Sequence, residues 1–302
     1  MFTSLLVPLD GSKLAETVLP VVRNLAERLH SAVKLIHVIE KRPPSTIHGE
    51  THLQDVGGAE SYLASVADLL SGWGLRVSTH VHTAPQEDIP RCIADHAVEL
   101  DQDLIVICTH GSGGVKRFVF GSNAQQVLTH GTIPVLLVKA SERDAAPSMD
   151  SLESILALLD KTPDSVPVLS SCAELAILFQ APLHLLYVVP TLSTVKPEEA
   201  PGGRLVPSAT RLLLDLEADE TASRLKNDVG MLRSRGIEAS GSVKRGEPVP
   251  AILDAAREHG ADLLSLGTRG PAGLGALWAN DLVARISSAY EGILLIFPGS
   301  KE

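Results

Sequence analysis

The second half of this 302-residue chain repeats the first, and the repeat constrains the fold more than any other feature. Aligning residue 5 with residue 155 and continuing without a gap to residue 39 against residue 189 places like residues opposite one another. The matched pairs include Leu6 with Leu156, Asp10 with Asp160, Leu25 with Leu175, Leu35 with Leu185 and Val38 with Val188. A period of about 150 residues is the usual size of one domain, so it predicts a duplicated domain rather than a solenoid of small units.

Within each half, apolar runs of strand length alternate with helical patterns. Continuous apolar runs are typical of parallel strands covered on both faces. The predicted strands are Leu5–Leu9, Val33–Ile39, Leu75–Val81, Leu104–Cys108 and Val135–Val138, then Ile155–Leu159, Leu183–Val189, Ile237–Val243, Leu263–Leu266 and Ile293–Phe297. Apolar residues with a period of 3.6 predict helices over Ala15–Leu29, Ala59–Leu70 and Ile89–Val98. The alternation predicts two tandem, doubly wound α/β domains, each a five-stranded parallel sheet with flanking helices.

The domain boundaries follow from composition. We expect a first domain over 1–140, a polar, turn-prone linker over 141–151 and a second domain over 152–302. Two longer irregular stretches, Lys41–Gly58 and Pro190–Ser208, follow the second strand of each half. Stretches of this length are either functional loops or disordered surface connections, and the sequence leaves both open.

A glycine-rich loop follows the strand Leu104–Cys108. It reads Thr109-His110-Gly111-Ser112-Gly113-Gly114, and Gly121-Ser122 then opens the next helical pattern. Glycines let backbone N–H groups approach an anion closely, and a helix N-terminus favours negative charge. A loop at the carboxyl end of a central parallel strand is also where open α/β sheets bind ligands. These residues predict a cradle for the phosphates of a nucleotide.

This pattern resembles the universal stress protein family, whose phosphate signature is G-x2-G-x9-G-[S/T]. Gly111 takes the second glycine position, and nine intervening residues lead to Gly121 and Ser122, but Cys108 occupies the first. The resemblance implies an adenine-nucleotide alpha hydrolase-like fold and a first domain that binds ATP or AMP, with or without Mg²⁺. The backbone at Cys108 must then do without the conformational freedom of glycine.

The resemblance also implies which positions meet the nucleotide. Asp10, at the end of the first strand, would accept hydrogen bonds from the adenine amino group or a ribose hydroxyl, whereas the residues alone equally allow Asp10 and Ser12 to cap the next helix. Main-chain atoms of Val38 would meet the base, although its side chain alone indicates core packing. The expected cofactor-binding set is Pro8, Leu9, Asp10, Val38, Ile107, Cys108, His110, Gly111, Gly121, Ser122 and Asn123.

Composition excludes other classes of function. The formal net charge of −10, with no lysine and arginine cluster, argues against nucleic acid as a partner. No apolar run has membrane-spanning length, and the first residues do not resemble a signal peptide, so we expect no membrane association. Three well-separated cysteines predict neither a disulfide framework nor a zinc site. A cytoplasmic protein is the expectation.

Catalytic motifs fail on spacing. No P-loop or dinucleotide fingerprint is present, and a G-x-S-x-G elbow would need glycine where His110 stands. An S-G-G-x-D-S loop for adenylyl transfer is also missing after the first strand. His80 and His82 alternate along a strand and are expected to be polar residues of one face rather than metal ligands. We therefore expect no catalytic residues, no metal site and at most slow ATP hydrolysis.

The second half restores the first glycine at Gly267 but places Asn280-Asp281 opposite Gly121-Ser122. Because an aspartate there would repel phosphate, we expect this domain to be degenerate for ATP.

By the resemblance, Val135–Val138 and Ile293–Phe297 would pair into an internal pseudo-dimer, with a homodimer also open. The resemblance implies a stress-response protein acting through regulated conformation or partner binding. The alternative is a scaffold or chaperone-like protein that binds no nucleotide.

Overall fold

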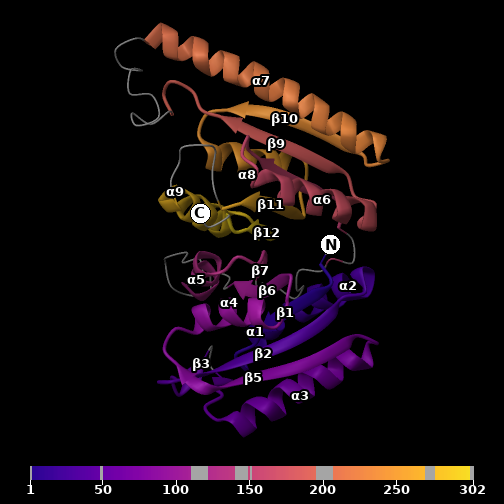
Figure 1. Cartoon of the computed structure of the whole chain (residues 1–302), viewed down its shortest axis with the longest axis vertical. Coiled ribbons are helices and arrows are strands. Elements are labelled where there is room, and N and C mark those ends of the chain that lie inside the picture. Colours follow the sequence, from indigo (N-terminus) through magenta and orange to yellow (C-terminus); the bar gives the residue numbers. More distant parts are fainter. Residues whose placement is uncertain are drawn as a thin grey trace. The chain divides into compact units, whose positions relative to one another are not determined.

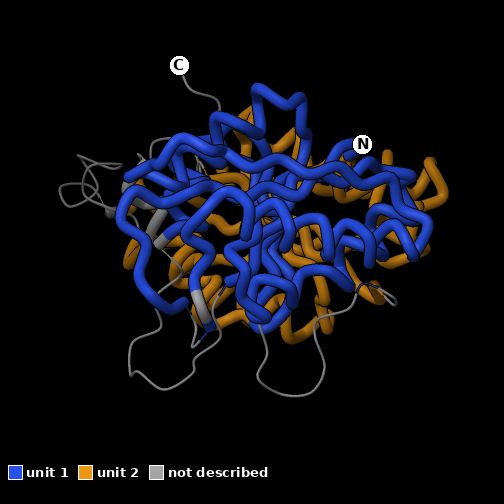
Figure 2. The backbone as a smooth tube through the Cα atoms, turned by 90° about the horizontal axis from the view of Figure 1, so that it is seen from below, with its two compact units in different colours: residues 1–151, 291–302 blue, residues 152–290 orange. Residues whose placement is uncertain are grey.

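The computed structural model of the chain describes residues 2–47, 50–109, 122–139, 149, 152–194, 207–268 and 276–299. Contacts divide the chain into two units, unit 1 with residues 1–151 and 291–302 and unit 2 with residues 152–290 (Figure 2). In both units strands and helices alternate (Figure 1), which confirms the expected α/β class. Within the described residues, we find no helix with the length and apolar character needed to cross a membrane. Of the expected linker over 141–151, the structure describes Met149 alone.

The sheet of unit 1 has the strand order β5-β2-β1-β6-β7, with all neighbours parallel. Its strands are β1 (Ser4–Pro8), β2 (Ala32–Glu40), β5 (Arg76–Gln86), β6 (Leu104–Thr109) and β7 (Val135–Lys139). From β1 the chain builds outward to β2 and β5, and it then returns to add β6 and β7 on the other side. This reversal between β1 and β6 is a topological switch point, where the carboxyl ends of the strands leave a crevice.

The last strand of the chain also belongs to unit 1. Strand β12 (Ile293–Phe297) pairs antiparallel with β7, and the register places Leu294 opposite Leu137 and Ile296 opposite Val135. These are the two final strands that we expected to pair. All five residues of β12 are buried. Burial of a large apolar side chain is worth about 1.5–3 kcal/mol, so burial of these five side chains stabilises the packing of β12 in unit 1.

The helices of unit 1 are α1 (Lys13–Glu16), α2 (Leu19–Leu29), α3 (Val56–Gly72), α4 (Ile89–Glu99) and α5 (Ser122–His130). The sequence predicted one helix over Ala15–Leu29, whereas the structure divides it between Thr17 and Val18. Pro20 lacks the N–H that would continue the ladder to Glu16, so the chain closes α1 with a tighter turn, Thr17 N–H to Leu14 carbonyl, 3.2 Å. The break lies beside the carboxyl end of β6, where Thr17 Oγ1 is 3.2 Å from Cys108 Sγ.

The segment that the sequence left irregular, Lys41–Gly58, contains ordered structure. A short antiparallel hairpin forms from β3 (Thr46–Ile47) and β4 (Glu50–Thr51). Helix α3 then begins with Asp55 as its cap, whose Oδ1 accepts a 2.9 Å hydrogen bond from the N–H of Gly58. The hairpin leads the chain back over the carboxyl ends of the central strands, so this segment contributes to the crevice.

Unit 2 repeats the order with four parallel strands, arranged β10-β9-β8-β11. They are β8 (Ile155–Leu159), β9 (Leu183–Val189), β10 (Ala239–Arg245) and β11 (Leu263–Gly267). The fifth strand expected for this half is β12, which the contacts group with unit 1. The helices are α6 (Ser165–Phe179), α7 (Pro207–Ser234), α8 (Pro248–Glu258) and α9 (Ala276–Ala289).

One carboxylate in each unit shows the duplication in atomic detail. Asp103 precedes β6 and accepts hydrogen bonds from the N–H of Thr3 at 2.7 Å and of Ser4 at 3.0 Å, where β1 begins. Asp262 precedes β11 and accepts from the N–H of Glu153 at 2.7 Å and of Ser154 at 3.0 Å, where β8 begins. Both fix the register of the two central strands and therefore the shape of the crevice at their other ends.

Candidate functional site

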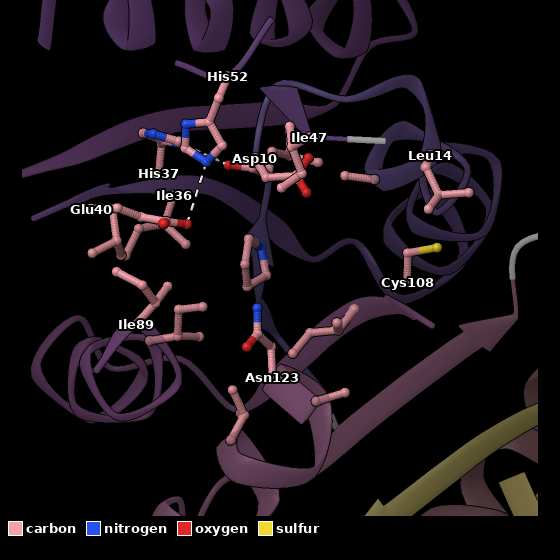
Figure 3. Close-up of a pocket in the computed structure, with 18 residues that line it drawn as sticks. Asp10, Leu14, Ile36, His37, Glu40, Ile47, His52, Ile89, Cys108 and Asn123 are labelled. Atoms are coloured by element: carbon pink, nitrogen blue, oxygen red, sulfur yellow. Dashed lines mark hydrogen bonds and ion pairs between the residues drawn. The ribbon is translucent and has the colours of Figure 1, made fainter. Parts of the chain in front are cut away.

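A cavity of about 160 Å³ lies at the carboxyl ends of β1, β2 and β6 in unit 1, at the switch point (Figure 3). Ligand pockets for whole small molecules run to about 300–1,000 Å³, so this one suits part of a larger ligand. Its walls come from the strand ends, from helices α1, α4 and α5, and from the β3 hairpin. The lining residues are Pro8, Leu9, Asp10, Leu14, Ala15, Ile36, His37, Val38, Glu40, Ile47, His52, Ile89, Ile93, Ile107, Cys108, Asn123, Ala124 and Val127.

Seven residues of the expected set therefore lie around one cavity: Pro8, Leu9, Asp10, Val38, Ile107, Cys108 and Asn123. Ser122 is the first residue of α5, and its side chain is outside the described part of the structure, as are His110, Gly111 and Gly121. The cavity is thus described on the side that would hold a nucleoside, whereas most of the expected phosphate loop is not.

The backbone of Val38 is open toward the cavity side of the sheet. Bonds between β1 and β2 engage alternate residues of β2: Ala32 donates to Thr3, and Ile36 accepts from Leu9 at 2.9 Å. By this alternation the N–H and carbonyl of Val38 also point toward β1. Among the described residues the β1–β2 ladder ends at the bond from Leu9 to Ile36, so Val38 presents a donor and an acceptor at the strand end.

His37 explains why the ladder stops there. Its Nδ1 lies 2.7 Å from the carbonyl oxygen of Leu9, and because that oxygen can only accept, Nδ1 carries the proton. The side chain thus takes the carbonyl that the N–H of Val38 would meet in a continued ladder. His37 is 3% exposed, and burial lowers its pKa. The hydrogen bond to Leu9 partly offsets this shift, whereas the nearby His52 lowers the pKa further. The imidazole is held neutral, in one tautomer.

His52 encloses the same side of the cavity from the β3–β4 segment. Its Nδ1 donates to the carbonyl of Leu53 at 2.8 Å, and its Nε2 lies 3.3 Å from Oε1 of Glu40 at the end of β2 (Figure 3). This is ion-pair distance, but the alignment makes no hydrogen bond. The contact ties the hairpin segment to β2. Neither histidine was identified from the sequence, where His37 was hidden inside an apolar strand and His52 inside an irregular stretch.

Ser12 takes the capping role that the sequence allowed, and Asp10 supports it. Ser12 is the cap of α1: its Oγ accepts a 3.1 Å hydrogen bond from the N–H of Ala15. Asp10 braces that cap, since its Oδ1 accepts from the N–H of Ser12 at 2.9 Å and from the Oγ at 2.6 Å. The Asp10 side chain also lines the cavity, close to His37 and Ile47 (Figure 3). Asp10 is therefore a fixed carboxylate at the cavity wall.

Cys108 has the backbone of an ordinary strand residue. It pairs with Val138 in the parallel β6–β7 register. Positive φ angles among the described residues other than glycine occur at His30, Asp101 and Gln180, and not at Cys108. Its Sγ lies 3.2 Å from the Oγ1 of Thr17, in the break between α1 and α2. Position 108 therefore does not need the conformational freedom of glycine in this fold.

The first turn of α5 closes the cavity opposite Asp10. Asn123 and Ala124 line it, and Figure 3 shows Asn123 on the far side from His37. The first N–H groups of a helix have no partner within the helix, and its dipole favours an anion. The arrangement offers polar groups for a nucleoside at the strand ends and a positive helix end for its phosphates.

Unit 2 keeps only part of this arrangement. Asp160 keeps the two bonds of Asp10, with its Oδ1 accepting from the N–H of Thr162 at 2.8 Å and from the Oγ1 at 2.6 Å, and it accepts a third from the Oγ of Ser165 at 2.7 Å. The distal element differs, because Asn280 and Asp281 lie inside α9, which begins at Ala276. The fixed offset pairs Asp281 with Ser122, the first residue of α5, so this alignment does not hold in the helices.

Comparison with known proteins gives a family for both halves. The sequence model of the Universal stress protein family matches residues 1–139 and again residues 152–286. A universal stress protein of Methanocaldococcus jannaschii is 27% identical over 151 residues, which cover 48% of this chain and 86% of that protein. The crystal structure of a universal stress protein from Archaeoglobus fulgidus superposes with a TM-score of 0.70 at 16% identity, covering 99% of this chain and 97% of that one. At that identity the superposition establishes the shared fold.

Proposed function

The chain belongs to the universal stress protein family, and from this premise we propose that unit 1 binds an adenine nucleotide, ATP or AMP, with its base and ribose in the 160 Å³ cavity. The protein then acts in the stress response by a nucleotide-dependent change of conformation or partner rather than by catalysis. The cytoplasm is the proposed location, and self-association into a homodimer remains part of the proposal.

The observation that carries this proposal is the strand end at Val38. Its N–H and carbonyl, side by side and unused by the ladder, match the acceptor N1 and the donor amino group on one edge of adenine. Asp10 adds a fixed carboxylate for the ribose hydroxyls or the amino group. Apolar walls from Ile36, Ile89 and Ile107 suit the two faces of the purine.

The phosphates would follow toward the first turn of α5. In this proposal Ser122 and the N–H groups around Gly111 and Gly121 hold them, with Asn123 at the rim of the cavity. Mg²⁺ would enter with ATP, and no protein ligand is assigned to it. His110 is proposed to flank the phosphates without a catalytic role.

A second candidate is a scaffold that works through its surface. Helix α7 exposes apolar side chains on neighbouring turns, with Leu212 at 62%, Leu213 at 65% and Leu216 at 51%. Isolated exposed leucines are ordinary, but three within five residues favour a contact surface. The two candidates are separated by nucleotide binding itself.

The test is calorimetric titration of the purified chain with ATP, AMP and inorganic triphosphate, each with and without Mg²⁺. The proposal expects saturable binding of both nucleotides, and weaker binding of triphosphate because it cannot use Val38 and Asp10. GTP serves as the matched control, since guanine carries an acceptor where adenine carries its amino group. No heat with any nucleotide would leave the scaffold candidate.

A further inference from the structure

Three histidines of unit 1 converge outside the nucleotide cavity. His80 and His82 lie on one face of β5, and His96 lies on α4. One ring nitrogen from each lies within 4.8 Å of the other two, and all three side chains are partly exposed. Their ring centroids are 4.8 Å apart for His80 and His96, and 4.9 Å apart for His82 and His96.

The fold makes this convergence direct. Residues two apart on a strand point to the same face, and β5 pairs with β2 so that His80 lies opposite Ile36 and His82 opposite Val38. Helix α4 packs on that face of the sheet (Figure 1). His96 follows Ile93 on α4 by three residues, and Ile93 itself lines the cavity. The histidine cluster is therefore one strand away from the proposed adenine site.

The contacts of the cluster orient two of its rings as the ligands of a metal site are oriented. The Nδ1 of His82 lies 2.8 Å from the Nε2 of His96, so these two nitrogens face inward. The outer nitrogen of His82 is 2.8 Å from the amide of Gln86. The outer nitrogen of His96 is 2.8 Å from Oε2 of Glu99, at ion-pair distance but out of line for a hydrogen bond. Such outer partners fix ligand tautomer and ring orientation at metal sites.

His80 supplies a second, independent observation. Its Nε2 is buried and has no hydrogen-bond partner in the described part of the chain. An imidazole nitrogen buried without a partner costs free energy that a ligand would recover. With His82 and His96 already joined nitrogen to nitrogen, the group best able to satisfy the cluster is a cation that accepts three imidazole lone pairs.

We propose that His80, His82 and His96 bind one divalent transition metal ion, with Zn²⁺ as the first candidate and a fourth position open to water. Three imidazoles with an open fourth position are a known zinc ligand set, and imidazole also suits Cu²⁺ and Ni²⁺. A tetrahedral site with Zn–N bonds of about 2.0–2.1 Å needs nitrogens about 3.3 Å apart. The nitrogens, which lie within 4.8 Å of one another, must close by up to about 1.5 Å, and the proposal assigns this shift to rotation of the partly exposed His80 ring.

Binding also requires one proton to move. In the present hydrogen-bond pattern the Gln86 amide N–H faces the Nε2 of His82, so the Nδ1 of His82 carries the proton shared with His96. When the metal takes that Nδ1, the proton passes to Nε2, which then donates a hydrogen bond to the oxygen of a flipped Gln86 amide.

The charges near the cluster act in opposite directions. Glu99 favours a bound cation, whereas Lys34 on β2 is near enough to His80 to oppose it. The metal would fasten the edge strand β5 to α4.

The test uses the untagged full chain, because a histidine tag would itself bind metal. Equilibrium dialysis against Zn²⁺ followed by elemental mass spectrometry is expected to give one ion per chain, and titration with Co²⁺ to give the visible absorption bands of a four-coordinate ion. His96→Gln removes a ligand and is expected to weaken Zn²⁺ binding by more than ~100-fold. Glu99→Gln removes an outer partner of a ligand and is expected to weaken Zn²⁺ binding by about 10- to 100-fold.

The matched control is His259→Ala in unit 2. His259 stacks on His184 at 3.6 Å, and both nitrogens of His184 are bonded to Ser240 and Ser242 at 2.9 Å, so this pair offers no comparable ligand set. It should leave Zn²⁺ affinity and stoichiometry unchanged. Circular dichroism of each variant distinguishes a lost ligand from a lost fold, and His80→Asn with His82→Asn repeats the test should His96→Gln unfold. Zn²⁺ binding that is absent from the folded wild-type chain would overturn the proposal. So would equal Zn²⁺ affinity in the folded wild type and in the folded His96→Gln chain, or in the folded chain that carries His80→Asn and His82→Asn.

Discussion

Replacing Asp10 by asparagine separates the two tasks assigned to this carboxylate. Asparagine keeps one oxygen, which can still accept from the N–H and the Oγ of Ser12, the bonds that brace the cap of α1. It replaces the other oxygen by an amide NH₂, which cannot accept a hydrogen bond from the amino group of adenine or from a ribose hydroxyl. We therefore expect a nearly unchanged fold and a clear loss of nucleotide affinity.

The magnitude follows from the kind of bond lost. A hydrogen bond to a charged group is worth about 1.5–3 kcal/mol, so Kd for ATP should rise by about 10- to 150-fold. The weakened bonds to Ser12 should lower the free energy of unfolding by about 0.5–1.5 kcal/mol at most. Binding of inorganic triphosphate should hardly change, since Asp10 is proposed to meet the nucleoside alone.

Asp160→Asn is the matched control, because Asp160 accepts the same pair of bonds from Thr162 in unit 2. It should lower thermal stability at least as much as Asp10→Asn does, because Asp160 also accepts a bond from the Oγ of Ser165, with no change in ATP affinity. Calorimetric titration of ATP and triphosphate, alongside thermal unfolding, measures all of these. Equal losses for ATP and triphosphate in Asp10→Asn, or no loss for either, would refute the nucleoside role and leave Asp10 as a brace for the cap.

Three further predictions test other parts of the account. Gly121→Leu should abolish ATP binding in a chain whose circular dichroism is unchanged, and retained affinity would remove Gly121 from the phosphate site. Cys108→Gly should leave ATP affinity unaltered or improve it, because the backbone at this position is regular strand; a weaker Kd by calorimetry would mean that the thiol contributes. Burial, reinforced by His259, lowers the pKa of His184 to about 4; the unfolded chain binds that proton below its ordinary pKa of about 6.5, so stability should fall between pH 6.5 and 4 by roughly 3 kcal/mol at most. His184→Asn should flatten urea-unfolding midpoints over this window, and an undiminished slope would contradict the assignment.

Much of the fold was predictable because burial on both faces leaves a strong pattern. The run Ile293–Phe297 has no polar residue, and its predicted bounds match β12. The single helix predicted over Ala15–Leu29 was wrong because periodicity registers side chains, whereas the break at Thr17 comes from the N–H that Pro20 lacks. Periodicity likewise could not show which unit the last strand would join, since that depends on long-range packing.

The candidate site was predictable where chemistry follows directly from a strand end. Asp10, Val38 and Cys108 each lie within one residue of the end of a predicted strand, and parallel strands bring their carboxyl ends to one edge. His52 reaches the cavity only through the fold of the segment after β2, whose irregular composition carries no periodic signal. His96 joins His80 and His82 from a helix, and no local spacing connects a strand residue to a helix residue 14 positions further on.

The most direct test of the central claim is the nucleotide content of the purified chain after saturation with ATP and removal of free ligand. The chain is denatured, and the released adenine nucleotide is counted by chromatography and mass spectrometry. We predict about one adenine nucleotide per chain, held by unit 1, with none remaining in Gly121→Leu. No adenine nucleotide on the wild-type chain, with no heat of binding in calorimetry, would contradict the proposed function. Two per chain would contradict the expectation that unit 2 is degenerate for ATP.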